Sequence, residues 1–181
     1  PWDGTGVKLA EPAFAGGGLP GVASAATMAG GPSTAIFQPT FSPDGLWVAF
    51  VRDYDLYTIH LETGREVRFT KDGRENEILN GINDWLYWEE IWDREDAGLW
   101  WSPDGKRIAY YRFDEREVPA HPLVDESPKV PQVNWQKYPK PGDPNPKVRI
   151  GVVNVSDGKT VWLESSDTTE HYIPRIYWTS D

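Results

Sequence analysis

The sequence predicts an all-β fold: a partial β-propeller of about two four-stranded antiparallel blades, the first strand of a third blade, and one short inserted helix. Three observations predict it. Short alternating runs of apolar residues are bounded by turn residues, the tetrapeptide Ser-Pro-Asp-Gly begins at both Ser42 and Ser102, and only residues 80–96 follow a helical period. With 39% hydrophobic and 13% aromatic residues, the 181-residue chain can bury a sizeable core.

Residues 1–35 form a segment rich in Gly, Ala and Pro with no sustained period, and we expect it to be extended or loop-like. Its uncharged part, 13–31, is too weakly apolar for a membrane span, and no basic region precedes it as in a signal peptide. This segment therefore precedes the expected propeller portion, 36–181.

The first blade is expected over residues 36–71. A short strand at 37–41 ends in the turn Ser-Pro-Asp-Gly, in which Pro43 presets φ and Gly45 can adopt a positive φ. Alternating segments at 46–52, 55–61 and 65–70 follow. Four antiparallel strands in about 35 residues match the size of one propeller blade.

A helix insertion is expected at residues 72–96, between the two blades. Asp84 is a suitable N-cap, and Trp85, Trp88 and Trp92 recur at i, i+3 and i+7, which places them on one face of an α-helix. Such an aromatic stripe usually packs a helix on its neighbours, and we assign this role to Trp85 and Trp92. Together with Tyr87, these tryptophans could alternatively surround a bound cation.

The candidate site residues are Glu89 and Glu90, with Tyr87 and Trp88 as residues that could line the site. Two carboxylates can each accept a charge-assisted hydrogen bond from a primary ammonium group. On an α-helix, however, Glu90 lies about 100° further round than Glu89, and acidic residues in such a run often form only a solvated face. The spacing alone leaves both interpretations open.

The second blade is expected over residues 97–165. The Ser-Pro-Asp-Gly turn that begins at Ser102 joins the first two strands of this blade, and a Pro-rich insertion at 114–147 separates them from the last two strands. Because proline excludes helix and central strand, we expect this insertion to be a loop at the blade edge. A third copy of the pattern begins at 172–181, which indicates a fragment of a longer propeller.

Composition excludes several functions. A net charge of −10 argues against a nucleic-acid partner, and the absence of cysteine excludes disulfides and thiolate chemistry. The three histidines lack metal-ligand spacing, so neither a metal nor a cofactor is expected. No Gly-x-Ser-x-Gly nucleophile motif is present, and no catalytic residue is assigned in this chain.

Long motifs resemble, in the same order, the N-terminal propeller domain of the dipeptidyl peptidase IV family, which comprises serine exopeptidases of the prolyl oligopeptidase type. They include Asn-Gly-Ile-Asn-Asp-Trp-Leu-Tyr-Trp-Glu-Glu at 80–90, and others lie at 41–45, 99–110, 113–119 and 138–148. The resemblance implies an enzyme that removes dipeptides from peptides with a free N-terminus. It further implies that Glu89 and Glu90 hold the substrate's α-ammonium group, whereas Trp88 replaces the acidic residue of some members.

The resemblance also implies partners. The catalytic α/β-hydrolase domain, with its Gly-Trp-Ser-Tyr-Gly motif, is expected beyond residue 181, so the chain alone should hydrolyse nothing. Unpaired strand edges favour association with another chain, including a homodimer. The family suggests a periplasmic, secreted or membrane-anchored protein. The alternatives are a non-catalytic propeller that binds other proteins and a propeller-capped oligopeptidase, which would lack the double-glutamate helix.

Overall fold

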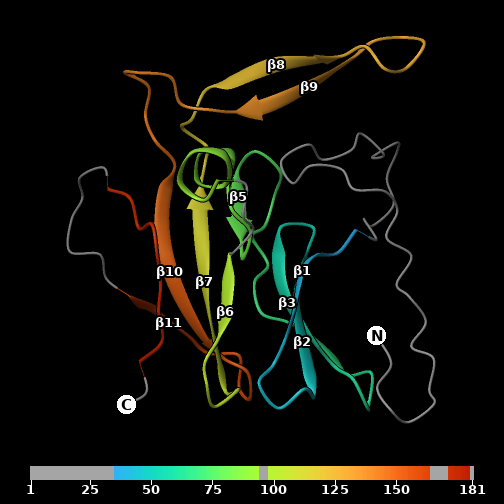
Figure 1. Cartoon of the computed structure of the whole chain (residues 1–181), viewed down its shortest axis with the longest axis vertical. Helices are drawn as coiled ribbons and strands as arrows, with labels where there is room; N and C mark the ends of the chain where they lie inside the picture. Colours follow the sequence, from blue (N-terminus) through green and yellow to red (C-terminus); the bar gives the residue numbers. More distant parts are fainter. Residues whose placement is uncertain (1–34, 94–97, 164–170, 180–181) are drawn as a thin grey trace.

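The computed structural model describes residues 35–93, 98–163 and 171–179. In these residues two antiparallel sheets lie side by side, and a separate β-hairpin crosses one end of them (Figure 1). This arrangement confirms the predicted all-β, partial-propeller class. The expectation for the N-terminal segment falls, apart from Ala35, outside the described residues.

The first sheet is the first predicted blade. It has the order β1-β2-β3-β4, with bounds β1 Phe37–Phe41, β2 Trp47–Arg52, β3 Asp55–His60 and β4 Glu66–Arg68. The predicted turn joins β1 to β2: the Gly45 N–H donates to the Ser42 carbonyl oxygen at 2.9 Å, and Gly45 has a φ of 72°. Gly105, with a φ of 68°, closes the second Ser-Pro-Asp-Gly turn in the same way.

The second sheet has the order β11-β10-β7-β5, with β6 also paired to β7. Both β5 and β6 pair antiparallel with β7, opposite residues 112–114 and 108–110 respectively, so together they act as one interrupted strand. The bounds are β5 Ile78–Asn80, β6 Leu99–Trp101, β7 Arg107–Asp114, β10 Lys147–Asn154 and β11 Thr160–Leu163. The helix insertion was expected to separate the blades; in the structure it interrupts the first strand of the second blade.

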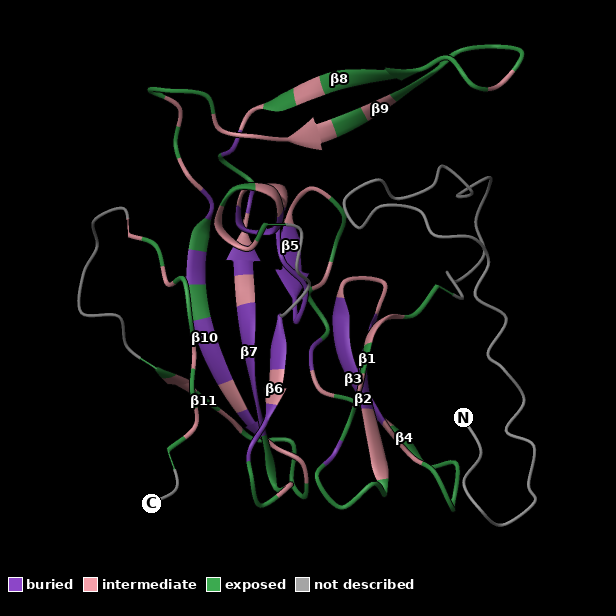
Figure 2. Cartoon of the chain, viewed as in Figure 1, coloured by how far each residue is buried: buried purple, intermediate pink, exposed green. Residues whose placement is uncertain are grey.

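The core lies between the two sheets and is contributed by both. Figure 2 shows the buried residues concentrated along the central strands, above all β7. Val51 and Leu56 of the first sheet belong to the same buried cluster as Ile108, Tyr111 and Phe113 of β7, and all five are 0% exposed. Burying an apolar side chain of this size contributes about 1.5–3 kcal/mol, so this shared core holds the two blades together.

The Pro-rich insertion differs from its prediction as a loop, because it contains a two-stranded hairpin, β8 (Ala120–Asp125) and β9 (Gln132–Lys137). Pro122 lies inside β8 opposite Trp135. Both strands are edge strands, and an edge strand tolerates a proline that a central strand does not.

The segment expected to begin a third blade is described only as far as residue 179. Residues 171–179 form no strand, because a strand needs a paired neighbour and no ladder joins this segment to another described residue. It nevertheless packs on the second blade, where the Tyr111 hydroxyl donates to the Ile173 carbonyl oxygen at 2.6 Å.

Candidate functional site

Two glycines close the base of the insertion that carries the helix. The Gly81 N–H donates to the Tyr111 carbonyl oxygen at 2.8 Å, and the Tyr111 N–H donates to the Gly98 carbonyl oxygen at 2.9 Å. A Cβ atom on Gly98 would collide with the backbone of Gly81. The two chain segments therefore meet at Tyr111, which is possible because Gly98 has no side chain there and Gly81 can adopt a φ of 74°.

A polar network centred on the buried Asp55 and Asn80 fixes the strand that leads into this base. Asp55 is 0% exposed and accepts hydrogen bonds from Arg68 at 2.5 Å and from the Asn80 amide at 3.3 Å. The Asn80 amide also donates to Asp72 at 3.0 Å, and Asp72 accepts from Arg112 of β7 at 2.7 Å. This network links the first blade to the start of the insertion. Breaking it would be costly, because the buried Asp55 carboxylate would lose its partners.

The helix is η1 (Leu86–Ile91), a π-helix of one turn. The Trp92 N–H donates to the Tyr87 carbonyl oxygen at 2.8 Å, an i→i+5 bond. The buried Asp84 carboxylate accepts the Tyr87 N–H at 3.0 Å. Asp84 was predicted as the N-cap; in the structure the N-cap position is Trp85, which makes no side-chain cap hydrogen bond. Burial raises the pKa of Asp84 to about 7. Single π-turns of this kind occur often at functional sites.

The π-helix changes which side chains face the core. Tyr87 and Trp88 are buried, at 1% and 3% exposure, whereas Trp85 and Trp92 are half-buried. The prediction of a Trp85–Trp88–Trp92 face assumed the α-helical period, which a π-turn does not follow.

Tyr87 takes a core position under the helix. Its ring centroid lies 4.7 Å from that of Phe113 and 5.5 Å from that of Tyr111, and its hydroxyl accepts the Ile173 N–H at 2.8 Å. Tyr87 therefore packs the helix onto β7 and onto the C-terminal segment.

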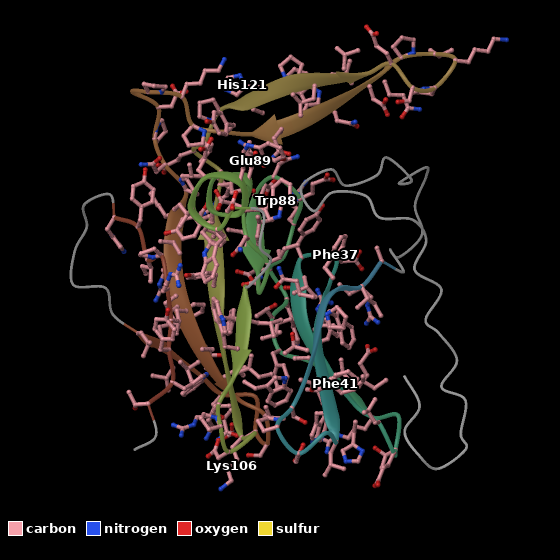
Figure 3. The ribbon with its side chains drawn as sticks, viewed as in Figure 1. Phe37, Phe41, Trp88, Glu89, Lys106 and His121 are labelled. Carbon is pink, nitrogen blue, oxygen red and sulfur yellow. The ribbon has the colours of Figure 1, made fainter. Side chains whose placement is uncertain are left out.

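Glu89 and Glu90 follow these buried residues in the same turn. Glu89 is half-buried and Glu90 is exposed. Figure 3 shows Glu89 on the side of the helix that faces the hairpin carrying His121, at the end of the sheets opposite to Phe41 and Lys106. A π-turn holds more residues than an α-turn, so successive side chains are separated by less than the 100° assumed from the sequence.

Tyr138, which follows β9, is a site neighbour that the sequence did not predict. Its hydroxyl donates to Glu90 Oε1 at 3.0 Å. The pKa of Tyr138 is raised, chiefly by this hydrogen bond, with a smaller contribution from the charge of Glu89. Both carboxylates thus act on one hydroxyl. The two residues of the hydrogen bond are 48 positions apart, and no local pattern in the sequence links them.

The arrangement places two carboxylates where a small cationic group could donate hydrogen bonds to them. Among the described residues, no group of three or more His, Asp or Glu side chains could hold a metal. Two adjacent carboxylates, of which one is already oriented by a neutral donor, offer several acceptor positions to the three N–H donors of an ammonium group.

None of the helices that the structure describes is long and apolar enough to cross a membrane.

The family model, the sequences and the solved structures that are similar to this chain all describe dipeptidyl peptidases. The sequence model of the dipeptidyl peptidase IV (DPP IV) N-terminal region matches residues 22–181. Dipeptidyl peptidase 4 of Sus scrofa is 38% identical over 138 residues, which cover 75% of this chain and 18% of that protein. The crystal structure of Porphyromonas gingivalis dipeptidyl peptidase 4 is similar, with a TM-score of 0.73 and 38% identity over 80% of this chain and 20% of that one. The chain thus spans about a fifth of the length of these relatives.

Proposed function

The chain belongs to the dipeptidyl peptidase IV family, and on this premise we propose that it holds the free N-terminus of a peptide while a serine exopeptidase releases dipeptides from it. Glu89 and Glu90 bind the α-ammonium group of the substrate. The propeller gates access, and an α/β-hydrolase domain outside residues 1–181 supplies the nucleophile. In this proposal the 181 residues alone are inactive.

One observation carries the proposal: two adjacent carboxylates lie in one π-turn whose base and core face are fixed by buried contacts. A charged group that enters a partly desolvated cleft needs compensating charge, because an unpaired charge there is costly. The N-terminal ammonium is the cation that every substrate of a dipeptide-releasing exopeptidase carries. The half-buried Glu89 and the exposed Glu90 would each accept a hydrogen bond from it.

The proposal is tested in the full-length protein with Glu89→Gln and Glu90→Gln. Removing one partner of a desolvated charge pair costs about 2–5 kcal/mol, which corresponds to a loss of roughly 30- to 3,000-fold in kcat/KM. We expect the smaller loss for Glu90, the more exposed residue. The two losses should not add, because both residues hold one group.

The control is a substrate whose N-terminus is acetylated. It should be poor for the parent enzyme and little changed by either substitution, and serine-directed labelling should be unaffected. If both variants cleave a free-amine substrate at the parental rate, Glu89 and Glu90 are only a solvated helix face.

The hairpin favours a second role, binding of another protein. Val124 pairs with Val133 and Pro122 pairs with Trp135, so these four residues share one face of the hairpin. Val124, Val133 and Trp135 are 59%, 53% and 58% exposed. An isolated two-stranded hairpin is marginally stable in water, so we propose a second copy of the protein as the partner that covers this face. A catalytically inactive propeller scaffold would use the same face without the glutamates.

A further inference from the structure

Tyr138 connects the base of the hairpin to the candidate site. Its N–H donates to the Pro119 carbonyl oxygen at 3.1 Å, and its own carbonyl oxygen lies 3.1 Å from His121 Nε2. These contacts fix the Tyr138 backbone where the two hairpin strands meet the blade. From there its hydroxyl reaches Glu90 Oε1 at 3.0 Å.

We propose that Tyr138 is a positioning residue that orients the Glu90 carboxylate toward the substrate ammonium and ties this orientation to the base of the β8–β9 hairpin. The inference rests on the proposed function, because it concerns how that site is held ready. It adds a residue from the Pro-rich insertion to a site otherwise built from the π-helix.

The physical reason is the conformational freedom of an exposed glutamate. A free Glu side chain occupies several rotamers, and ordering it on binding weakens affinity. A tyrosine has only two side-chain torsions, so once its backbone is fixed its hydroxyl has little freedom of position. A hydrogen bond to a charged acceptor is also stronger than one between neutral groups. Tyr138 therefore restricts Glu90 before the substrate arrives.

The hydrogen bond leaves the ammonium site open. A carboxylate has about four acceptor positions, and Tyr138 uses one of them, on Oε1. The hydrogen bond with Glu90, and then the negative charges of Glu90 and Glu89, raise the pKa of the Tyr138 hydroxyl. The hydroxyl consequently keeps its proton and stays a donor at neutral and mildly alkaline pH.

The test compares four variants of the full-length protein: Tyr138→Phe, Glu90→Ala, their combination, and Tyr177→Phe. The last is a matched control, because Tyr177 is 75% exposed and its hydroxyl takes part in a hydrogen bond with Arg175 rather than with the site. We expect Tyr138→Phe to raise KM for a free-amine dipeptide substrate about two- to tenfold and to leave kcat within about twofold. A contact made equally in ground and transition states changes KM in this way.

In the Glu90→Ala background, Tyr138→Phe should have no further effect, and Tyr177→Phe should match the parent in both constants. KM does not depend on the fraction of active enzyme, so partial misfolding of a variant would lower the apparent kcat and leave the KM comparison valid.

Each other outcome has one meaning. If Glu90→Ala weakens the enzyme but Tyr138→Phe leaves KM unchanged, this inference is wrong and the proposed function stands. If Glu90→Ala changes nothing, this inference is wrong, and Glu90 has no part in the proposed function, which then depends on the result for Glu89. A Tyr138→Phe effect that persists in the Glu90→Ala background would show that Tyr138 does not act through Glu90.

Discussion

Replacing Asp84 with asparagine tests how the π-helix is held. Asp84 is 4% exposed, and burial raises its pKa from 3.8 to about 7. Between these two values the folded protein keeps a proton that the unfolded chain releases. The free energy of unfolding therefore falls as pH rises from about 4 to about 7, and the loss persists at higher pH.

The size of this effect follows from the shift in pKa. A shift of about three units corresponds to about 4 kcal/mol, which is an upper value. Asparagine has no charge to bury, and its carbonyl oxygen can still accept the Tyr87 N–H, but its NH2 group brings donors that need partners. Allowing about 1 kcal/mol or more for these donors, we expect Asp84→Asn to stabilise the protein by about 1–3 kcal/mol at pH 8.

Glu115 should increase the stability that Asp84→Asn gains at high pH. It is 4% exposed, and its pKa is raised to about 8, chiefly by burial and then by the charge of Asp84, while Lys137 opposes the shift. Removing the charge at position 84 lowers the cost of ionising Glu115 and so adds to the gain at high pH.

The assay is the difference in Tm between the variant and the parent, measured at pH 5 and pH 8 on the full-length protein. The difference should be small at pH 5 and should become more favourable to the variant at pH 8. Asp104→Asn is the control. The pKa of Asp104 is lowered, chiefly by its hydrogen bond with Ser102, so Asp104 stays charged across this range. An Asp84→Asn variant that loses equal stability at both pH values would show that the ionised carboxylate is required.

Two further predictions concern the base of the insertion and the hairpin. Gly98→Ala should lower the free energy of unfolding by more than the loss of about 1–3 kcal/mol usual for an overpacked core, which a fall in Tm would report. The reason is that the new methyl group meets the backbone of Gly81 rather than a movable side chain. Gly64→Asn is its control, since Gly64 has a φ of 68° and open space around it, and it should cost little. Trp135→Ser should weaken self-association, measured by analytical ultracentrifugation, without changing Tm by more than a few degrees. An unchanged dissociation constant would show that this face of the hairpin does not take part in self-association.

Local patterns were sufficient to predict the all-β class and most strands of the two sheets. Ser-Pro-Asp-Gly encodes its own turn through Pro43 and Gly45, and alternation encodes each strand, so both features follow from residues adjacent in sequence. The interrupted strand was not predictable in this way. Ile78–Asn80 pairs with β7 because Gly81 and Gly98 allow the chain to leave and return at Tyr111, and the partners in that contact are far apart in sequence.

Part of the local structure around Glu89 and Glu90 was predicted, and their role stays a prediction. The adjacent glutamates, the Asp84 contact and the helical turn follow from residues 80–96, and the family resemblance assigned the glutamates a role. The helix type was missed, because a π-turn depends on how Tyr87 and Trp88 pack rather than on the spacing of apolar residues. Tyr138 was missed because a hydrogen bond between residues 48 positions apart leaves no local signal.

The most direct measurement of the central claim is a crystal structure of the full-length protein with a bound peptide that has a free N-terminus. The account predicts that the α-ammonium nitrogen lies about 2.7–3.2 Å from a carboxylate oxygen of Glu89 and from one of Glu90, with Tyr138 still donating to Glu90. A peptide bound in the active-site cleft with its ammonium nitrogen beyond hydrogen-bonding distance of both carboxylates would contradict it.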